Sequence, residues 1–334
     1  MTAPGRRRIL LSQGPGTLHS QGIDRLDFTS YNVRLSGKPT LTGREMVAAL
    51  PEINRIAEIV FDDDAPHPQA THEEIRRLAR FLDTAARRDD IDGIVWVQGT
   101  NTLEETAYFL NLTVRSSKPV VVVGAQRPFT AMSTDAHLNL VNAVRVAACE
   151  EAVGMGVVVV TNSEIIAARD VTKTSTYQVQ TFRGRDLGLL GYADPDRVVF
   201  YHAARRRHTT QSAFDIQAIE SLPMVEVVYP HTGANPDLAR AAVDLGATGL
   251  VIAGIGAGAL GAFTAPVKAL VARGVVVVRS ARVGEGRVLA CGNNHAEGTI
   301  AADNLNPQKA AVLLTLALTQ TRDTVALQRI FDEY

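Results

Sequence analysis

Two threonines and a lysine have the types and sequence surroundings that nucleophilic chemistry requires. Thr17 follows an apolar run and the turn GPG at 14–16, and Thr100 follows another apolar run and a glycine. A hydroxyl held on a tight turn after a strand can serve as a nucleophile once a neighbouring group removes its proton. A glycine turn at the end of a strand can also cradle a phosphate. These residues alone leave both interpretations open.

Lys173 lies among threonines in the segment 168–191, which has no periodicity and is too long for a simple turn. A lysine in such a segment is usually a surface residue. Within reach of a threonine hydroxyl it could instead act as a base, or as the cation that lowers the pKa of a base.

The apolar runs that precede these residues predict a parallel sheet. Residues 92–99, 118–125 and 155–162 are short, β-branched and apolar, which is typical of strands buried on both faces. Helical patterns separate them, so we expect right-handed βαβ units and place Thr100 at the carboxyl edge of the sheet, where ligands bind in such folds. Residues 100–102 can equally cap the following helix, with a capping box over 102–105.

The second half of the chain predicts a separate domain. A polar segment precedes it, and its three arginines at 205–207 are interpreted as a solvated linker rather than a nucleic-acid patch. Strand-like runs then resume at 224–230, 248–256 and 274–282. The expected fold class is α/β, with a larger N-terminal parallel-sheet domain and a smaller C-terminal α/β domain. The expected boundaries are 1–202 for the catalytic domain, 203–222 for the linker and 223–334 for the C-terminal domain.

The composition excludes several classes of protein. The chain has 334 residues, of which 46% are hydrophobic and 21% charged, and its formal net charge is −1. That balance predicts no nucleic-acid partner and no attraction to an anionic membrane. No run approaches 18 apolar residues and no signal-peptide pattern is present, so we expect a cytoplasmic protein. Cys149 and Cys291 are isolated and lack metal-ligand spacing, so neither a disulfide nor a zinc site is expected.

Two further motifs favour ordinary structural interpretations. GIGAGALG at 254–261 fits a dinucleotide fingerprint, but the next strand ends near Arg279 instead of an acidic residue. Although an arginine could suit a 2′-phosphate, a tight strand–helix turn is favoured. His67 and His72, followed by Glu73, lie in a proline-containing segment and match no defined metal motif, so we expect a solvated loop.

Taken together, these stretches resemble the bacterial-type L-asparaginase family over nearly the whole chain. The family's T-G-G-T-[IL] aligns with GPGTL, its H-G-T-D-T-x-E-E-T-A with QGTNTLEETA, and its K-P-V-V-x-x-G-A-M-R-P with KPVVVVGAQRP. The segments RDVTKTST and LNPQKAAVLLTLALTQT match as well. The aligned ranges are 14–18, 98–107, 118–144, 169–176 and 305–321.

The resemblance implies a function and a set of site residues. In this family threonines attack a side-chain amide, release ammonia and let water hydrolyse the acyl-enzyme. Thr17 would be the nucleophile, and Thr100 with Lys173 would activate water or the nucleophile. The substrate-binding residues that it implies are Gly16, Gly99, Asn101, Ala125 and Tyr31. It implies a small amide substrate, no cofactor, no metal, and a homodimer or homotetramer with sites at the intimate dimer interface.

The departures from the family pattern concentrate in substrate recognition. Asn101 stands where the family has an aspartate that pairs with the lysine and binds the α-ammonium of the substrate. Ala259 stands where an asparagine commonly reaches the neighbouring subunit's site. The acidic stretch 61–74 offers no counterpart of the serine loop that grips the α-carboxylate, and 291–298 offers none of a distant glutamate. Tyr31 lies in a poorly aligned loop.

These departures lead to three hypotheses. The leading hypothesis is an asparaginase-like amidohydrolase with altered substrate recognition, acting on an amide with a changed or missing amino-acid head. The alternative is a non-catalytic ligand-binding protein on the same scaffold. A nucleotide-binding oxidoreductase, suggested by GIGAGALG, is the third.

Overall fold

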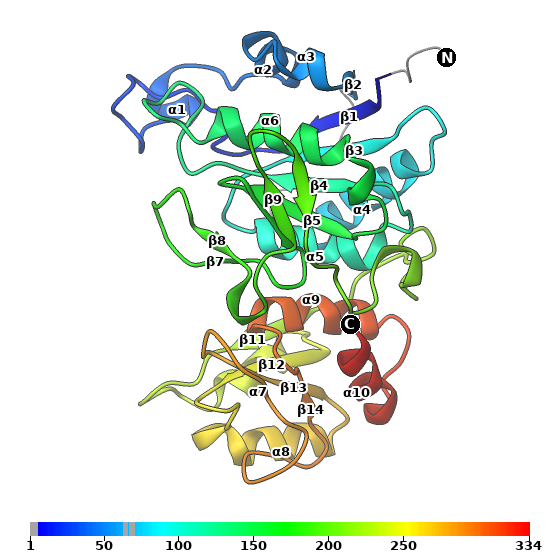
Figure 1. The fold of residues 1–334 in the computed structure, drawn as a ribbon. Helices are drawn as coiled ribbons and strands as arrows, with labels where there is room; N and C mark the ends of the chain where they lie inside the picture. Colours follow the sequence, from blue (N-terminus) through cyan, green and yellow to red (C-terminus); the bar gives the residue numbers. More distant parts are fainter. Residues whose placement is uncertain (1–5, 63–65, 67–70) are drawn as a thin grey trace. The chain divides into compact units, whose positions relative to one another are not determined.

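The computed structural model describes residues 6–62, 66 and 71–334, and the chain divides into two compact units (Figure 1). One unit comprises Met1–Ser212 and the other Ala213–Tyr334, so the division falls within the stretch expected to be a linker, 203–222. Both units are α/β and both contain a largely or wholly parallel sheet, which confirms the predicted fold class. His67 lies outside the described residues, as does half of the acidic stretch 61–74. The loop expected at His72 and Glu73 is wrong, because these two residues begin a helix that Thr71 and Glu74 cap.

The N-terminal unit is built on an eight-stranded sheet in the order β10-β9-β6-β5-β4-β3-β1-β2. The five strands from β5 to β2 are parallel, and β6, β9 and β10 extend the sheet in antiparallel fashion. The strands are β1 (Arg8–Gln13), β2 (Glu58–Phe61), β3 (Gly93–Val97), β4 (Val120–Val123), β5 (Val157–Thr161), β6 (Glu164–Ala167), β9 (Gly191–Ala193) and β10 (Val198–Phe200). A separate hairpin is formed by β7 (Thr172–Lys173) and β8 (Phe182–Arg183).

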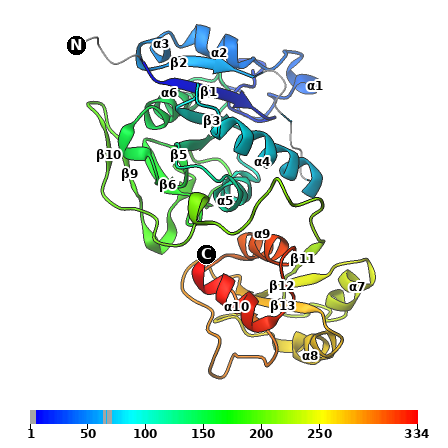
Figure 2. The same cartoon turned by 90° about the vertical axis from the view of Figure 1, so that its right-hand side faces the viewer.

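Helices cover both faces of this sheet because its central strands are apolar on both sides. On one face α2 (Gly43–Ala49), α3 (Ile53–Ile56) and α6 (Ala136–Ala147) share a core with alternate residues of the strands. On the other face lie α4 (His72–Ala86) and α5 (Leu103–Thr113) (Figure 2). The short elements of this unit are α1 (Val33–Ser36), η1 (Glu150–Ala152), η2 (Arg185–Leu187) and η3 (Thr209–Gln211).

The capping box expected over 102–105 is wrong. Thr102 is the N-cap of α5, but its side chain makes no capping hydrogen bond. In a capping box the N-cap side chain accepts from the backbone N–H of the N3 residue, which here is Glu105, and Thr102 accepts no such bond. Glu104, one position earlier in the first turn of α5, is buried and binds the β7 strand.

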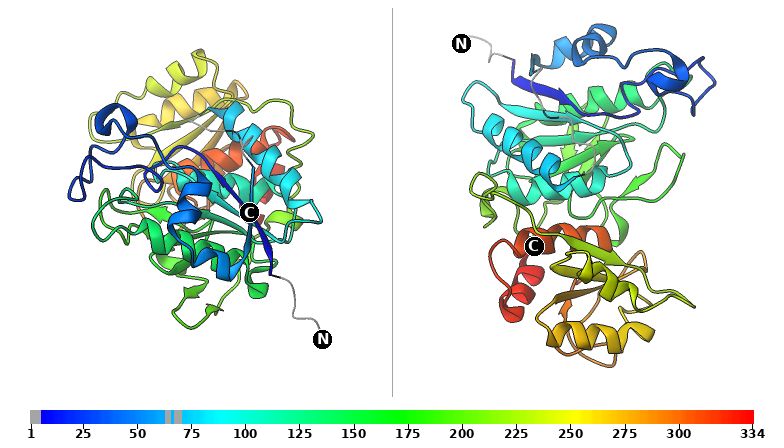
Figure 3. Two further views of the ribbon diagram at one scale, coloured as in Figure 1. Left: turned by 90° about the horizontal axis from the view of Figure 1, so that it is seen from above. Right: turned by 180° about the vertical axis from the view of Figure 1, so that it is seen from behind.

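Three adjacent parallel strands bring the loops of interest to one edge of the sheet. Gln13 at the end of β1 pairs with Val97 at the end of β3, and Val97 pairs with Val123 at the end of β4. The loops that follow therefore leave the same edge. Helix α1 and the β7–β8 hairpin extend on this side of the unit in both Figure 1 and Figure 3.

The C-terminal unit contains a parallel four-stranded sheet in the order β11-β12-β13-β14. Its strands are β11 (Val225–Val228), β12 (Gly249–Gly254), β13 (Val276–Ala281) and β14 (Ile300–Ala301). Its helical elements are α7 (Leu238–Asp244), η4 (Gly261–Phe263), α8 (Thr264–Ala272), α9 (Pro307–Ala317) and α10 (Thr324–Glu333). The three apolar runs expected in this half each form a strand.

GIGAGALG forms a tight turn between β12 and α8. Ile255 and Ala259 exchange two backbone hydrogen bonds across it, and Gly256 and Gly258 both have positive φ. Arg279 is fully buried, and its guanidinium donates to Thr299 and to backbone carbonyls of the loop between β13 and β14. It is therefore not available to bind the 2′-phosphate of a dinucleotide.

Within the described part of the chain, no helix combines the length and the apolar character needed to cross a bilayer.

Candidate active site

The two glycine–threonine turns are packed directly against each other. The amide N–H of Gly99 donates to the carbonyl of Pro15 (2.8 Å), and the N–H of Gly14 donates to the carbonyl of Val97 (2.8 Å). A Cβ built on Gly16 would lie 2.2 Å from the amide nitrogen of Gly99. Only glycine fits such a backbone approach. The glycine after the first strand therefore serves to bring Thr17 beside the loop that carries Thr100.

Thr17 is buried, with 9% of its surface exposed. Its side chain makes no hydrogen bond with any described residue, whereas the backbone around it is fixed. Its carbonyl accepts from the N–H of Ser20 (3.0 Å), and the Ser20 hydroxyl donates to the carbonyl of Gly16 (2.7 Å). A fixed backbone with an uncommitted hydroxyl suits a group that reacts with a ligand.

Thr100 and Lys173 are in direct contact. Lys173 Nζ donates to Thr100 Oγ1 at 2.7 Å, and Thr100 is buried while Lys173 is half-buried. Burial lowers the pKa of Lys173 below the ordinary lysine value, because desolvation disfavours the ammonium form. A lysine with a lowered pKa beside a hydroxyl can accept a proton from it.

Glu104 fixes the strand that carries Lys173. Its carboxylate accepts from the Thr172 hydroxyl (2.6 Å) and from the backbone N–H of Lys173 (3.3 Å). Lys173 pairs with Phe182 across the β7–β8 hairpin. The lysine is therefore anchored from α5 on one side and from β8 on the other.

Gln126, in the turn after β4, completes the surroundings of Thr100. Its Oε1 lies 3.2 Å from Thr100 Oγ1, and its Nε2 donates to the carbonyls of Ser175, Thr176 and Gln178. The Asp135 carboxylate accepts from the backbone N–H of Gln126 (2.9 Å) and holds the turn in place.

No hydrogen bond between described residues joins the other predicted site residues to this cluster. Ala125 is buried in the turn beside Gln126. Asn101 is exposed, and its side chain forms no hydrogen bond with a described residue. Tyr31 is half-buried before α1, and no hydrogen bond between described residues joins it to Thr17. Ala259 lies in the GIGAGALG turn of the C-terminal unit.

Sequence reasoning missed the roles of Gln126, Glu104 and Ser20. Glu104 stands within the segment QGTNTLEETA, where its place on a helix suggested capping. Its burial with a threonine and a lysine from a different loop could be recognised only in three dimensions. Gln126 stands where the family motif has methionine, but its role was missed because a single glutamine after a strand is common in surface turns.

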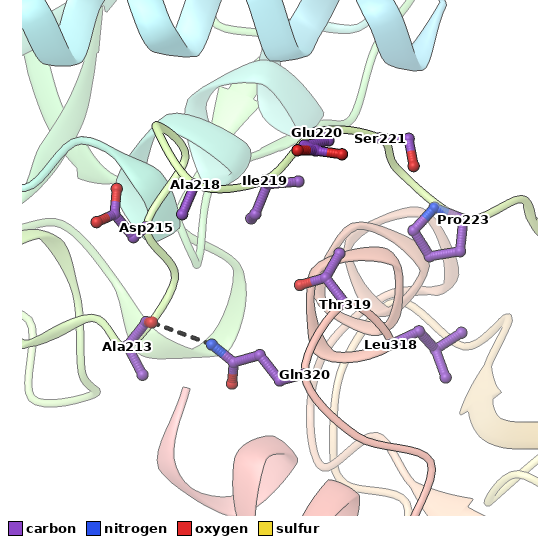
Figure 4. Close-up of a pocket in the computed structure, with 10 residues that line it drawn as sticks. All are labelled: Ala213, Asp215, Ala218, Ile219, Glu220, Ser221, Pro223, Leu318, Thr319 and Gln320. Atoms are coloured by element: carbon purple, nitrogen blue, oxygen red, sulfur yellow. Dashed lines mark hydrogen bonds between the residues drawn. The ribbon is translucent and has the colours of Figure 1, made fainter.

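The described residues contain no group of three or more His, Cys, Asp or Glu side chains placed to hold a metal ion. A pocket of about 510 Å³ lies in the C-terminal unit, between the segment 213–223 and residues 318–320, which follow α9 (Figure 4). The side-chain amide of Gln320 donates to the carbonyl of Ala213 at its side. No candidate catalytic residue lines this pocket.

Two family models match the chain in the order of its two units. "Asparaginase, N-terminal" matches residues 16–206, and "Glutaminase/Asparaginase C-terminal domain" matches residues 224–331. Together they span both units, including Gly16, Thr17, Thr100 and Lys173.

Named relatives match over almost the whole chain. An L-asparaginase 2 of Bacillus subtilis is 40% identical, over 96% of this chain and 84% of that protein. A glutaminase-asparaginase of Pseudomonas fluorescens is 36% identical, over 98% and 90%. The crystal structure of a probable cytoplasmic L-asparaginase from Campylobacter jejuni superposes with a TM-score of 0.91 at 38% identity, covering 98% of this chain and all of that one.

Proposed function

The chain belongs to the bacterial-type asparaginase family, and on that premise we propose that this amidohydrolase uses Thr17 to cleave a carboxamide other than free L-asparagine. The observation that carries the proposal is the 2.7 Å contact between Lys173 Nζ and Thr100 Oγ1, beside the turn of Thr17. The relatives named above are L-asparaginases and glutaminase-asparaginases, which supports amide hydrolysis as the reaction.

In the first half of the reaction Thr17 Oγ1 attacks the amide carbon. The new C–O bond forms as the C–N bond breaks, and the hydroxyl proton of Thr17 passes to the leaving nitrogen, which departs as ammonia. Negative charge that develops on the carbonyl oxygen needs donors already in place. The backbone N–H groups of Thr17 and Thr100 make no hydrogen bond to a described backbone carbonyl, whereas that of Gly99 is engaged by Pro15. We assign the oxyanion to the first two.

In the second half, water hydrolyses the acyl-threonine. The neutral amine of Lys173 takes the Thr100 proton while Thr100 Oγ1 takes a proton from the attacking water. The water oxygen bonds to the acyl carbon, and the departing Thr17 oxygen takes up the proton that Lys173 accepted, which restores the neutral amine. The products are a carboxylic acid and free Thr17, and the pair of Thr100 and Lys173 thus activates the water that releases the acyl group.

The proposed change of substrate rests on Asn101. An asparagine has no charge to offer an α-ammonium group, and its exposed side chain is not joined to Lys173 by a hydrogen bond. Loss of a charge-assisted hydrogen bond costs roughly 1.5–3 kcal/mol. That corresponds to about one to two decades in affinity, so amides without a free α-amine are the favoured substrate class.

Ammonia release from a substrate panel tests this proposal. The panel contains L-asparagine, L-glutamine, D-asparagine, N-acylated asparagine and amides without an α-amine. We expect an amide without the free ammonium to have the highest kcat/KM, and Thr17→Ala to abolish its hydrolysis. Thr17→Ser, which keeps the hydroxyl, is the matched control and should retain measurable turnover.

The variant Asn101→Asp tests the proposed substrate class independently of the proposed nucleophile. It should raise kcat/KM for L-asparagine by about 10- to 100-fold and lower kcat/KM for the preferred amide. A wild type that already prefers L-asparagine would overturn the altered specificity and leave the nucleophile untouched. If no amide is cleaved by either protein, and ligands are recovered intact after long incubation, the non-catalytic alternative replaces this account.

A further inference from the structure

We propose that Gln126 is a positioning residue that orients the hydroxyl proton of Thr100 and thereby sets the direction of the hydrogen bond between Thr100 and Lys173. This inference rests on the proposed function of that pair. In the family motif aligned above, the position of Gln126 is occupied by methionine, which has no side-chain amide.

The orientation of the Gln126 amide is determined by its neighbours. Three backbone carbonyls of the loop 175–178 lie 3.2–3.4 Å from Nε2. Carbonyl oxygens only accept, so the NH2 group must face them. A flipped amide would place its oxygen against three other oxygens. The remaining atom, Oε1, therefore faces Thr100 at 3.2 Å.

This orientation dictates where the Thr100 proton lies. An amide oxygen only accepts, so Thr100 must donate its single O–H to Gln126. The lone pairs of Thr100 Oγ1 are then left to accept from Lys173 Nζ at 2.7 Å. The resting arrangement is a chain of donors from Lys173 to Thr100 to Gln126, which favours the ammonium form of Lys173.

Gln126 thus competes with the Lys173 amine for the Thr100 proton. For Lys173 to act as a base, the Thr100 O–H must turn from Gln126 toward the amine. Removal of the Gln126 oxygen makes that turn easier and stabilises the neutral amine. The pH at which Lys173 becomes active should then fall.

Three charged groups that are bonded to Lys173 or Gln126, or paired beside Lys173, stay constant in the test. Glu104 of α5 accepts from its backbone N–H, and Arg183 of β8 lies opposite the adjacent Thr172. Asp135, at the start of α6, holds the backbone of Gln126. The cross-strand partner of Lys173 itself is the uncharged Phe182.

The experiment is the pH dependence of kcat/KM for two variants of Gln126 with opposite expected effects. Gln126→Met keeps the length of the side chain without the amide. It should lower the apparent pKa of the rising limb, the part of the profile where kcat/KM increases with pH, by about 0.5–1 unit. Gln126→Glu places a carboxylate near Lys173 and should raise this apparent pKa. Thr130→Val is the control, because Thr130 lies on the same turn and binds Gly22 rather than Thr100.

Opposite shifts in the two Gln126 variants, with none in the control, support the proposal. A loss of kcat in both variants without a shift of the rising limb would overturn the proposal. Gln126 would then have only a structural role in holding the loop 175–178. Lys173→Met distinguishes this failure from that of the proposed function. If Lys173→Met leaves the rising limb of the pH profile in place, Lys173 is not the base and the proposed function fails. If Lys173→Met removes the rising limb but Gln126→Met does not shift it, only the inference about Gln126 fails.

Discussion

At the scale of single residues, hydrolysis of the acyl-enzyme requires the neutral, proton-accepting form of Lys173. Burial lowers its pKa, so the fraction of neutral amine rises with pH at values below those of an ordinary lysine. The rate should therefore rise with pH and level off earlier than an exposed lysine would allow. Lys173→Met should lower kcat by about 10²- to 10⁴-fold and abolish this rise.

A pH–rate profile of wild type and Lys173→Met checks this prediction. Lys118 provides a matched control, since its Nζ binds the carbonyl of Arg88 and not Thr100. Lys118→Met should leave the profile unchanged. An unaltered rising limb in Lys173→Met would contradict the assignment of Lys173 as the base.

Residue types indicated part of this site in advance, but not all of it. Thr17, Thr100 and Lys173 were recognisable because each belongs to a motif, and the structure places Lys173 on Thr100. Gln126 and Glu104 also stand in motifs, but their roles were not recognisable because they arise from contacts with the segment 172–178. A sequence does not show which of several polar loops at a sheet edge will meet.

At the scale of elements, the site depends on the close approach of the loops after β1 and β3. A Cβ on Gly16 would lie 2.2 Å from the Gly99 nitrogen, so Gly16→Ala must push the two loops apart. Overpacking of this kind costs about 1–3 kcal/mol of stability, or a fall in Tm of roughly 2–10 °C. Activity should fall further than stability, because Thr17 moves away from Thr100.

Gly284→Ala is the control for this prediction, since a Cβ there meets nothing within 4 Å and its φ is not positive. Calorimetry and ammonia release measure the two effects. A Gly16→Ala protein as stable and as active as Gly284→Ala would show that the close contact of the two loops is not needed.

The elements themselves were predicted unevenly. The apolar runs gave the central strands of both sheets, because strands buried on both faces are continuously hydrophobic. The antiparallel extension by β6, β9 and β10 was missed, since these strands have only three or four residues each and β10 is only half-buried. Their pairing depends on neighbouring strands more than on their own sequence.

At the scale of the whole molecule, we propose that the active form is at least a homodimer. Within one chain, Asn101 is exposed and its side chain forms no hydrogen bond with a described residue. A second chain could complete that side of the site, as the family resemblance implies. Sedimentation at decreasing protein concentration should show dissociation and loss of specific activity over the same range. A monomer with full activity would contradict the proposed dimer.

Cytoplasmic location likewise stays a prediction.

The most direct test of the central claim is to locate the acyl group on the protein. The preferred amide from the panel is mixed with wild type and with Lys173→Met, in which hydrolysis of the intermediate should be slowed. The reaction is quenched in acid, and the peptides are analysed by mass spectrometry. The account predicts an acyl adduct on Thr17, accumulating in Lys173→Met. An adduct on Thr100, with Thr17 unmodified, would contradict it.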